Sequence, residues 1–445
     1  MERIARLLNF RRDELVPGLL AALLFFCVLC GYFFLRPVRE AMGVSRGMDE
    51  LRWLFVVTSV VSLAFVLAFG GAISRVDRRR ALPIGYGFVI ACLLAFAGLL
   101  AVDAARGGGL VGSGVHTVLS RNIAYTYYVW LSVINLFATS LFWAYMVDLF
   151  DTGQGKRMFA FIGVGGTLGA MTGGWVTTAI SGATDSPYLP AGLLLLGAAL
   201  FTAAIAVMRN LDRVTERRHT AAAARPAPVP LGGTFWDGAA AVLKSPYLLG
   251  IGGYIALLAV SNTMIYFAQA HLVLDSTDTF SQRVQRFALF DAMAETTVLL
   301  TQLFITTRLI RRLGVGWTLA ILPLVTAAGF AALAAWPVLG VMAVFQALHR
   351  GTRHAISRPA RETLFSVLSP AEKYKAKPVV DVFVYRGGDV AGAGMDALLR
   401  AAGLPLAGIA AATVPLAAGW AALSVALGRA QRRREAQAPD PGPRE

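Results

Sequence analysis

Twelve long apolar runs dominate the 445-residue sequence and limit what it can fold into more than any other feature. A run of about 20 apolar residues forms a helix that crosses a bilayer, because inside lipid a helix satisfies its own backbone polar groups. The sequence therefore predicts an all-α membrane protein with twelve transmembrane helices. The runs cover residues 15–35, 54–73, 82–102, 125–147, 158–180, 189–208, 247–270, 287–307, 317–336, 338–355, 379–399 and 405–427. Those at 338–355 and 379–399 fit least well because both contain charges.

The composition excludes a water-soluble domain, since 56% of the residues are hydrophobic and only 15% are charged. If the N-terminus is cytoplasmic, roughly three quarters of the 41 Lys and Arg residues lie on the cytoplasmic side. The positive-inside rule therefore predicts a multi-pass membrane protein with both termini in the cytoplasm. The net charge of +15 follows from the same asymmetry and requires no nucleic-acid partner.

The N-terminal residues 1–14 contain four arginines and precede the first apolar run. A signal peptide would look similar, but no small-residue cleavage site follows, so we expect a retained helix after a short interfacial segment. Cys27 and Cys30 have the spacing of a redox or metal pair. They lie in an apolar run without further ligands, which favours small core residues and predicts neither a metal nor a cofactor.

A polar, Ala- and Pro-rich stretch divides the chain into two sets of six runs. It predicts an interfacial segment at 1–14, bundles at 15–208 and 241–428, a cytoplasmic linker at 209–240 and a cytoplasmic tail at 429–445. Two similar segments support a repeat: "GKRMFAFIGVGGTLGAMTGG" at 155–174 and "AKPVVDVFVYRGGDVAGAG" at 376–394. This layout resembles the major facilitator superfamily, whose pseudo-symmetric halves hold the substrate near the midplane.

The loop after the second run, "GGAISRVDRRRAL" at 70–82, resembles the signature loop of that superfamily but lacks its second glycine. Asp77 and Arg78 would then form a charged clasp that is made in one conformation and released in another. A plain basic loop that obeys the positive-inside rule is the alternative.

Charged residues inside the apolar runs are candidates for function, because each costs several kcal/mol unless it lines water or has a partner. Arginine fits phosphate or carboxylate, so the basic residues predict binding of an anion. These are Arg36, Arg39, Arg358, Arg361, Lys375, Lys377 and Arg386. The residues expected in gating or proton coupling are Asp77, Arg78, Asp148, Asp291, Glu295, Asp381 and Asp389. A structural network of salt bridges is the alternative for part of this set.

Helical spacing groups some of these charges. Asp291 and Glu295 are four residues apart and would share a helix face. A basic stripe with steps of four, four and three is expected down the tenth helix, formed by Arg350, His354, Arg358 and Arg361. His349 and His354 lack the further ligands of a zinc site.

The spelling Arg-Pro-x-Arg-Glu occurs twice, as "RPVRE" at 36–40 and "RPARE" at 358–362. The predicted topology puts the first at the periplasmic end of helix one and the second at the cytoplasmic end of helix ten. They would be anion-collecting or gate-closing arginines at opposite mouths of one pathway. Chance similarity in an Arg-rich chain is the alternative.

Four segments together resemble the nucleotide translocase branch of the superfamily, the ATP/ADP exchangers and their bacterial relatives. They are "YFFLRPVREAMGV", "SLFWAYMVDLFDTGQGKRMFAFIGVGGTLGAMTG", "LKSPYLLGI" and "KYKAKPVVDVFVYRGGDVAG". The resemblance implies exchange of nucleotides without hydrolysis, with functional cations at Arg39 and at Lys375 or Lys377. The family's two functional glutamates fall near Leu131 and Ile265, which are not acidic, so the sequence departs from the family's pattern at both positions.

No Walker-type loop is present, so any transport must be driven by exchange or by an ion gradient. We therefore expect a secondary-active transporter, not an enzyme, that works by alternating access on a small anionic substrate such as a nucleotide. The alternative is a proton-coupled carrier of an unrelated solute or drug. A membrane-embedded receptor or enzyme fits less well because no cluster of nucleophiles or metal ligands is evident.

Overall fold

The computed structural model describes residue 11 and residues 14–73, 78–107, 118–219, 235–304 and 306–437. Helices take up nearly all of these residues, and they contain no strand. The first half contains α2 (Leu15–Val44), α3 (Met48–Ile73), α4 (Arg78–Ala105), α5 (Val118–Leu149), α6 (Thr152–Ala183) and α7 (Leu189–His219). Each of the first six predicted apolar runs lies on one of these helices, in order.

The second half contains shorter pieces as well as long helices, and two of the pieces, η1 and η2, are π-helical. Its elements are α8 (Phe235–Lys244), α9 (Pro246–Asp275), α10 (Phe280–Phe304), α11 (Thr306–Ala335), α12 (Leu339–Gly351), η1 (Thr352–Ser357), α13 (Arg358–Leu364), α14 (Pro370–Pro378), η2 (Val379–Val384), α15 (Tyr385–Ala401) and α16 (Leu406–Gln437).

By length and composition, nine of the described helices are able to cross a membrane. The three remaining predicted spans are α3 and the two charged spans of the second half. Each charged span is divided by a π-helix, α12–η1–α13 in one and α14–η2–α15 in the other. The sequence predicted a single span for each. The charges and the π-helix within each one explain why neither is a single long apolar helix.

The described residues divide into two compact units. Unit 1 takes those within Met1–Pro226 and Val273–Thr296, and unit 2 takes those within Ala227–Leu272 and Thr297–Glu445. This differs from the predicted bundle boundaries in one place, because the first two thirds of α10 belong to unit 1. Side chains of this part of α10 pack on unit 1: Ala292 lies against Gly174, and Gln285 against Gly182.

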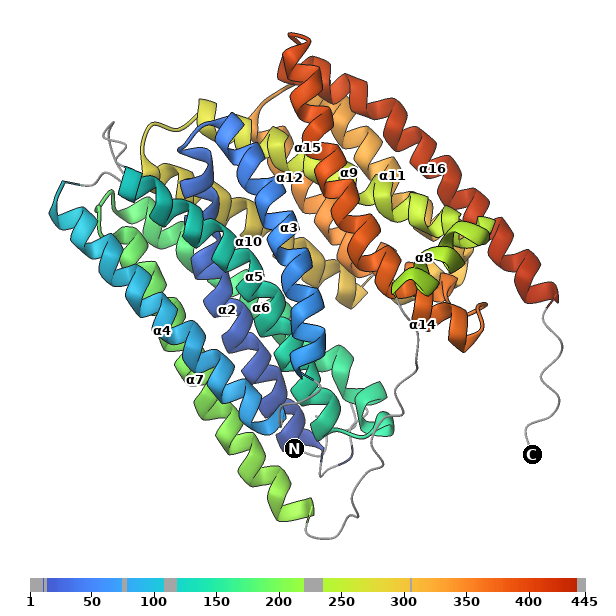
Figure 1. The fold of residues 1–445 in the computed structure, drawn as a ribbon, viewed down its shortest axis with the longest axis horizontal. Coiled ribbons are helices and arrows are strands. Elements are labelled where there is room, and N and C mark those ends of the chain that lie inside the picture. Colours follow the sequence, from blue (N-terminus) through green and yellow to red (C-terminus); the bar gives the residue numbers. More distant parts are fainter. Residues whose placement is uncertain are drawn as a thin grey trace. The chain divides into compact units, whose positions relative to one another are not determined.

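In unit 1, α2 packs between α5, α6 and α7 (Figure 1). Gly165, Gly169 and Gly173 repeat every four residues on α6 and so share one face. A Cβ added to any of them would come within 2.7 Å or less of a backbone carbonyl oxygen of α2. Small residues therefore let the two helices approach closely, as membrane helices without a hydrophobic driving force require.

Unit 2 uses the matching segment of the repeat in the same way. Gly388 and Gly392 on α15 face Ala259 and Thr263 of α9, with the nearest atoms 2.7–2.8 Å from an added Cβ. The core of the unit lies between α9, α11, α13 and α16, where the rings of Tyr254 and Trp420 are 5.3 Å apart.

The predicted linker at 209–240 is shorter in the structure, because α7 continues to His219 and α8 begins at Phe235. The extension of α7 is anchored: Leu211 is fully buried, and the Tyr145 hydroxyl donates to Asp212 Oδ1 at 2.6 Å. Likewise, α16 continues to Gln437, past the start of the predicted tail. Residues 220–234 and 438–445, and most of residues 1–14, lie outside the described residues.

Candidate functional site

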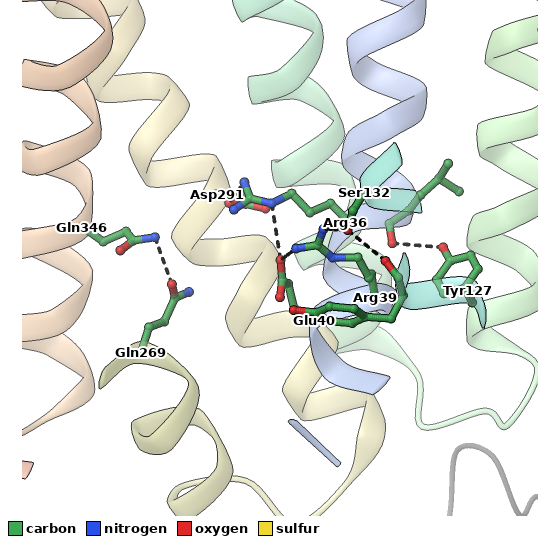
Figure 2. A network of polar contacts seen from close by, with 10 residues as sticks. Arg36, Arg39, Glu40, Tyr127, Ser132, Gln269, Asp291 and Gln346 are labelled. Carbon is green, nitrogen blue, oxygen red and sulfur yellow. Dashed lines mark hydrogen bonds and ion pairs between the residues drawn. The ribbon is translucent and has the colours of Figure 1, made fainter. Parts of the chain in front are cut away.

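The end of α2 carries a compact group of charges in unit 1, which we call the α2 charge cluster: Arg36, Arg39, Glu40 and Asp291. Figure 2 shows Arg36 reaching Asp291 of α10, with Nη1 donating to Oδ1 at 2.7 Å. Arg36 Nε lies 3.7 Å from Glu40 Oε1, and Arg39 forms an ion pair with the same carboxylate. Two guanidinium groups thus face two carboxylates, and the cluster is balanced in charge.

Helix α5 supplies two further contacts of Arg39. Its Nη1 donates to Ser132 Oγ at 2.6 Å, and its guanidinium lies 4.7 Å from the ring centre of Tyr128. Glu40 and Asp291 are only 2% and 3% exposed, so each needs a cationic partner. Glu295, one turn further along α10, is also buried. The predicted anion ligands Arg36 and Arg39 therefore have carboxylate partners within unit 1.

Unit 2 holds a second arginine in a different setting, which we call the Arg353 cluster: Arg353, Asn262 and Tyr385. Arg353 Nη1 donates to Asn262 Oδ1 at 2.7 Å, and Nη2 donates to the Tyr385 hydroxyl oxygen at 2.8 Å. Both partners are neutral. Among the described residues no carboxylate lies within ion-pair distance of Arg353; Asp389 acts on this guanidinium at longer range and is itself paired with Arg386.

Asp389, predicted to take part in gating or coupling, is paired with Arg386 one turn before it on α15. Arg386 Nη1 lies 3.0 Å from Asp389 Oδ2, and the Thr263 hydroxyl of α9 donates to the other carboxylate oxygen at 3.3 Å. Asp389 is 2% exposed, which makes this pair part of the interface between α9 and α15.

The predicted sites on α13, α14 and η2 form one chain of ion pairs. Arg361 Nη2 lies 3.7 Å from Asp381 Oδ1, and Lys377 pairs with Glu362. Arg358 differs, because it is exposed and has no hydrogen bond or ion pair among the described residues. The structural network that the sequence left open as an alternative is thus present for Arg361, Lys377 and Asp381.

The predicted basic stripe is not uniform in exposure. Along it Arg350 is buried, His354 is partly buried and Arg358 is exposed. The reason is η1, in which a π-helical turn holds more residues than an α-helical turn and breaks the four-residue periodicity.

The other predicted site residues lie apart from these clusters or outside the description. Asp148 is exposed near the end of α5, about 24 Å along that helix from Ser132. Asp77 lies outside the described residues, and the side chains of Arg78 and Lys375 are not described. Within the described residues no group of three or more His, Cys, Asp or Glu is placed to hold a metal ion.

No protein-family model matches the sequence, and no curated protein matches it. Solved structures do match. A POT family transporter in complex with 5-aminolevulinic acid has a TM-score of 0.62 at 10% identity, over 93% of this chain and 96% of that one. A bacterial homologue of the iron transporter ferroportin has 0.60 at 14%, over 95% and 98%. The nucleoside transporter NupG has 0.57 at 15%, over 94% and 99%.

The chain has the major facilitator fold. This confirms the predicted all-α, twelve-helix class, with matches that span nearly the whole length of each protein. All three matched proteins are transporters by name, and none is an enzyme. At such low identity the matches show the fold and leave the substrate to be argued from the residues.

The sequence reasoning did not select the Arg353 cluster. Its signal was present, since Asn262 and Arg353 are polar residues inside apolar runs. The tyrosine gave no such signal, because Tyr385 looks like any amphipathic residue near the start of a helix.

Proposed function

We propose that this chain is a secondary-active transporter that works by alternating access and exchanges a nucleotide or another phosphorylated anion. The fold supports transport, and the Arg353 cluster is the single observation that supports an anion. The asymmetry of Lys and Arg supports an inner-membrane protein with both termini in the cytoplasm.

The physical basis of the proposal is that no carboxylate among the described residues contacts Arg353 directly, since Asp389, which acts on it at longer range, is paired with Arg386. A guanidinium inside a membrane protein is costly unless it has a counter-charge or lines water. Two neutral acceptors, Asn262 and Tyr385, satisfy part of the hydrogen-bonding capacity of Arg353 but do not neutralise its charge. A phosphate or carboxylate group would accept hydrogen bonds from the forked donors of Arg353 and place a negative charge in contact with it. Arg353 is therefore the proposed anion ligand.

The α2 charge cluster has a different role in this proposal. Arg36 and Arg39 hold the end of α2 against α5 and α10 through their carboxylate partners. The resemblance to nucleotide translocases had implied that Arg39 and Lys377 contact the substrate. Both residues have acidic partners in the structure, so any contact with an anion would have to compete with those carboxylates.

Exchange in proteoliposomes tests the function. Purified protein is reconstituted with unlabelled ADP inside, and uptake of radiolabelled ATP and ADP is measured with and without an excess of competing phosphorylated compounds. We expect uptake that depends on internal nucleotide and is largely lost in Arg353→Gln. Arg433→Gln, which removes an exposed arginine of α16, serves as the matched control and should transport normally. If well-folded wild type takes up no phosphorylated anion, the substrate claim fails while the fold stands.

A proton-coupled carrier is the second candidate, and one observation favours it. Asp291 and Glu295 are both buried and lie one turn apart on α10, which suits a pair of carboxylates that exchange a proton. An imposed pH gradient distinguishes the two candidates. It should accelerate uptake into empty liposomes if transport is proton-coupled, and leave nucleotide exchange unchanged if it is not.

A further inference from the structure

A row of hydrogen bonds follows one face of α9 in unit 2. The α9 positions are 247, 254, 262 and 269, in steps of seven or eight residues, or about two helical turns. Their partners lie in reverse order on α13, η1 and α12. The bonds are Tyr247 to the Leu364 carbonyl at 2.8 Å, Tyr254 with Ser357 at 2.7 Å, Asn262 with Arg353 at 2.7 Å, and Gln269 with Gln346 at 2.9 Å.

The last two of these contacts contain polar groups with capacity to spare. On α12 and the start of η1, Gln346 and Arg353 both bond side chains of α9, and His349 lies between them in the sequence. Gln346 and Arg353 are seven residues apart, roughly 10 Å along a helix. The facing residues on α9, Gln269 and Asn262, have the same separation. We call this set the α9–α12 strip.

The glutamine pair leaves one carbonyl oxygen and one amide nitrogen without a hydrogen bond among the described residues (Figure 2). Gln346 Nε2 donates to Gln269 Oε1, which leaves the Gln346 carbonyl and the Gln269 amide nitrogen. Neither remaining group has a partner among the described residues, and neither atom is fully enclosed. A free donor beside a free acceptor matches an amide-like edge, such as the hydrogen-bonding edge of a nucleobase.

His349 lies between the two ends of the strip. It is 1% exposed, its Nε2 has no partner among the described residues, and its ring packs edge-on against Phe345. A buried imidazole nitrogen without a partner is costly, so it is a further group in the strip that a polar ligand would satisfy.

We infer that the α9–α12 strip binds an elongated ligand, with an amide-like heterocycle edge at Gln269 and Gln346 and an anionic group at Arg353. The glutamine pair thus selects a base-bearing phosphate, a nucleotide, over an anion without a base. This inference rests on the proposed function and adds the residues that determine its specificity. The competing role for the pair is packing alone, since buried glutamines also join membrane helices by hydrogen bonds.

The test measures base preference instead of overall activity. Inhibition of labelled ADP uptake by ADP, by adenosine and by ribose 5-phosphate is compared in wild type and in the double variant Gln269→Leu/Gln346→Leu. The double variant removes both partners together, so neither is left buried without the other. Gln431→Leu is the matched control, because Gln431 is equally buried in unit 2 but bonds the Thr363 carbonyl outside the strip.

We expect wild type and Gln431→Leu to prefer ADP to ribose 5-phosphate. In the double variant this preference should fall about tenfold, mainly because ADP binds more weakly, while inhibition by ribose 5-phosphate is unchanged. An unchanged preference, or an equal loss for both compounds, overturns the inference and leaves the proposed function intact. Absence of uptake of any phosphorylated compound by wild type overturns both.

A binding measurement on wild type keeps the inference testable if the double variant does not fold. Thermal unfolding of the detergent-purified protein is followed with saturating ADP, adenosine or ribose 5-phosphate. Stabilisation by ADP well above that by ribose 5-phosphate is expected. Equal stabilisation by the two phosphates contradicts a base subsite.

Discussion

The two arginine clusters solve the same physical problem in different ways. In the α2 charge cluster, Arg36 and Arg39 face Glu40 and Asp291, so opposite charges offset the loss of hydration. In the Arg353 cluster, an amide and a hydroxyl hold the guanidinium in place without neutralising it. The difference teaches that an arginine inside a membrane protein is informative through its partners. An arginine paired with carboxylates indicates a structural role, and an arginine with neutral partners alone is a candidate for binding a ligand.

The largest expected effect is on stability, in the α2 charge cluster. Arg36→Gln or Asp291→Asn alone leaves a poorly compensated charge and should lower the free energy of unfolding by about 3 kcal/mol. The double variant replaces the ion pair by two amides and should recover most of that loss. Thermal unfolding of the purified proteins in detergent measures both. A double variant no more stable than the worse single variant would show that the two residues act independently.

The next effect is on substrate binding, in the Arg353 cluster. Arg353→Gln removes two hydrogen bonds to neutral groups but leaves no unpaired charge, so stability should change by only about 1 kcal/mol. The KM for nucleotide exchange should rise by about ten- to a hundredfold, because the proposed anion ligand is lost. Arg353→Lys, which keeps the charge but not the fork, should give an intermediate KM. A normal KM in Arg353→Gln would show that Arg353 does not bind the substrate, and the proposed difference in role between the two clusters would fail.

A smaller effect is expected at the start of α2, outside the membrane-spanning part. Burial raises the pKa of Glu14, but hydrogen bonds from the Arg157 side chain and the Arg11 amide, with the charge of Arg157, lower it below the ordinary 4.5 overall. A lowered folded-state pKa gives stability that is present above the unfolded value and lost as the pH falls through the folded one.

Glu14→Gln should therefore destabilise the protein by about 1 kcal/mol at neutral pH. The difference from wild type should shrink as the pH falls below 4.5, in a series of thermal unfolding measurements. A difference that also stays constant below pH 4.5 would mean that Glu14 acts through packing instead of charge.

The smallest effect concerns the repeated sequence motif Arg-Pro-x-Arg-Glu. Arg36 is paired with Asp291, whereas Arg358 is exposed and has no partner among the described residues. Arg358→Glu should leave stability unchanged and slow exchange by only about two- to threefold, an effect that added salt removes. Arg36→Glu should mainly destabilise the protein. If neither change alters transport at low salt, the two arginines are not anion collectors and the shared spelling is coincidence.

The fold could be predicted because it depends on local patterns. Apolar runs of the right length form the helices, and several glycines of the two similar segments lie where two helices approach closely. The charged spans could not be predicted in detail, because η1 and η2 interrupt their helices. A run of apolar and basic residues carries no signal for the extra residue per turn of a π-helix.

The candidate site was less predictable because its partners are far apart in the chain. Asp291 is 255 residues from Arg36, and Asn262 is 91 residues from Arg353. The sequence identified most of the charged members as costly in lipid. It could not tell which arginine had a carboxylate opposite it and which had an amide, and that distinction separates the two clusters.

Equilibrium binding of radiolabelled ADP to the purified protein tests this account most directly. It compares wild type, Arg353→Gln and the stability-matched double variant Arg36→Gln/Asp291→Asn. The account predicts that Arg353→Gln loses at least about tenfold in affinity, while the double variant stays within about threefold of wild type. Normal binding by Arg353→Gln together with lost binding by the double variant would contradict it, and would place the anion at the end of α2 instead.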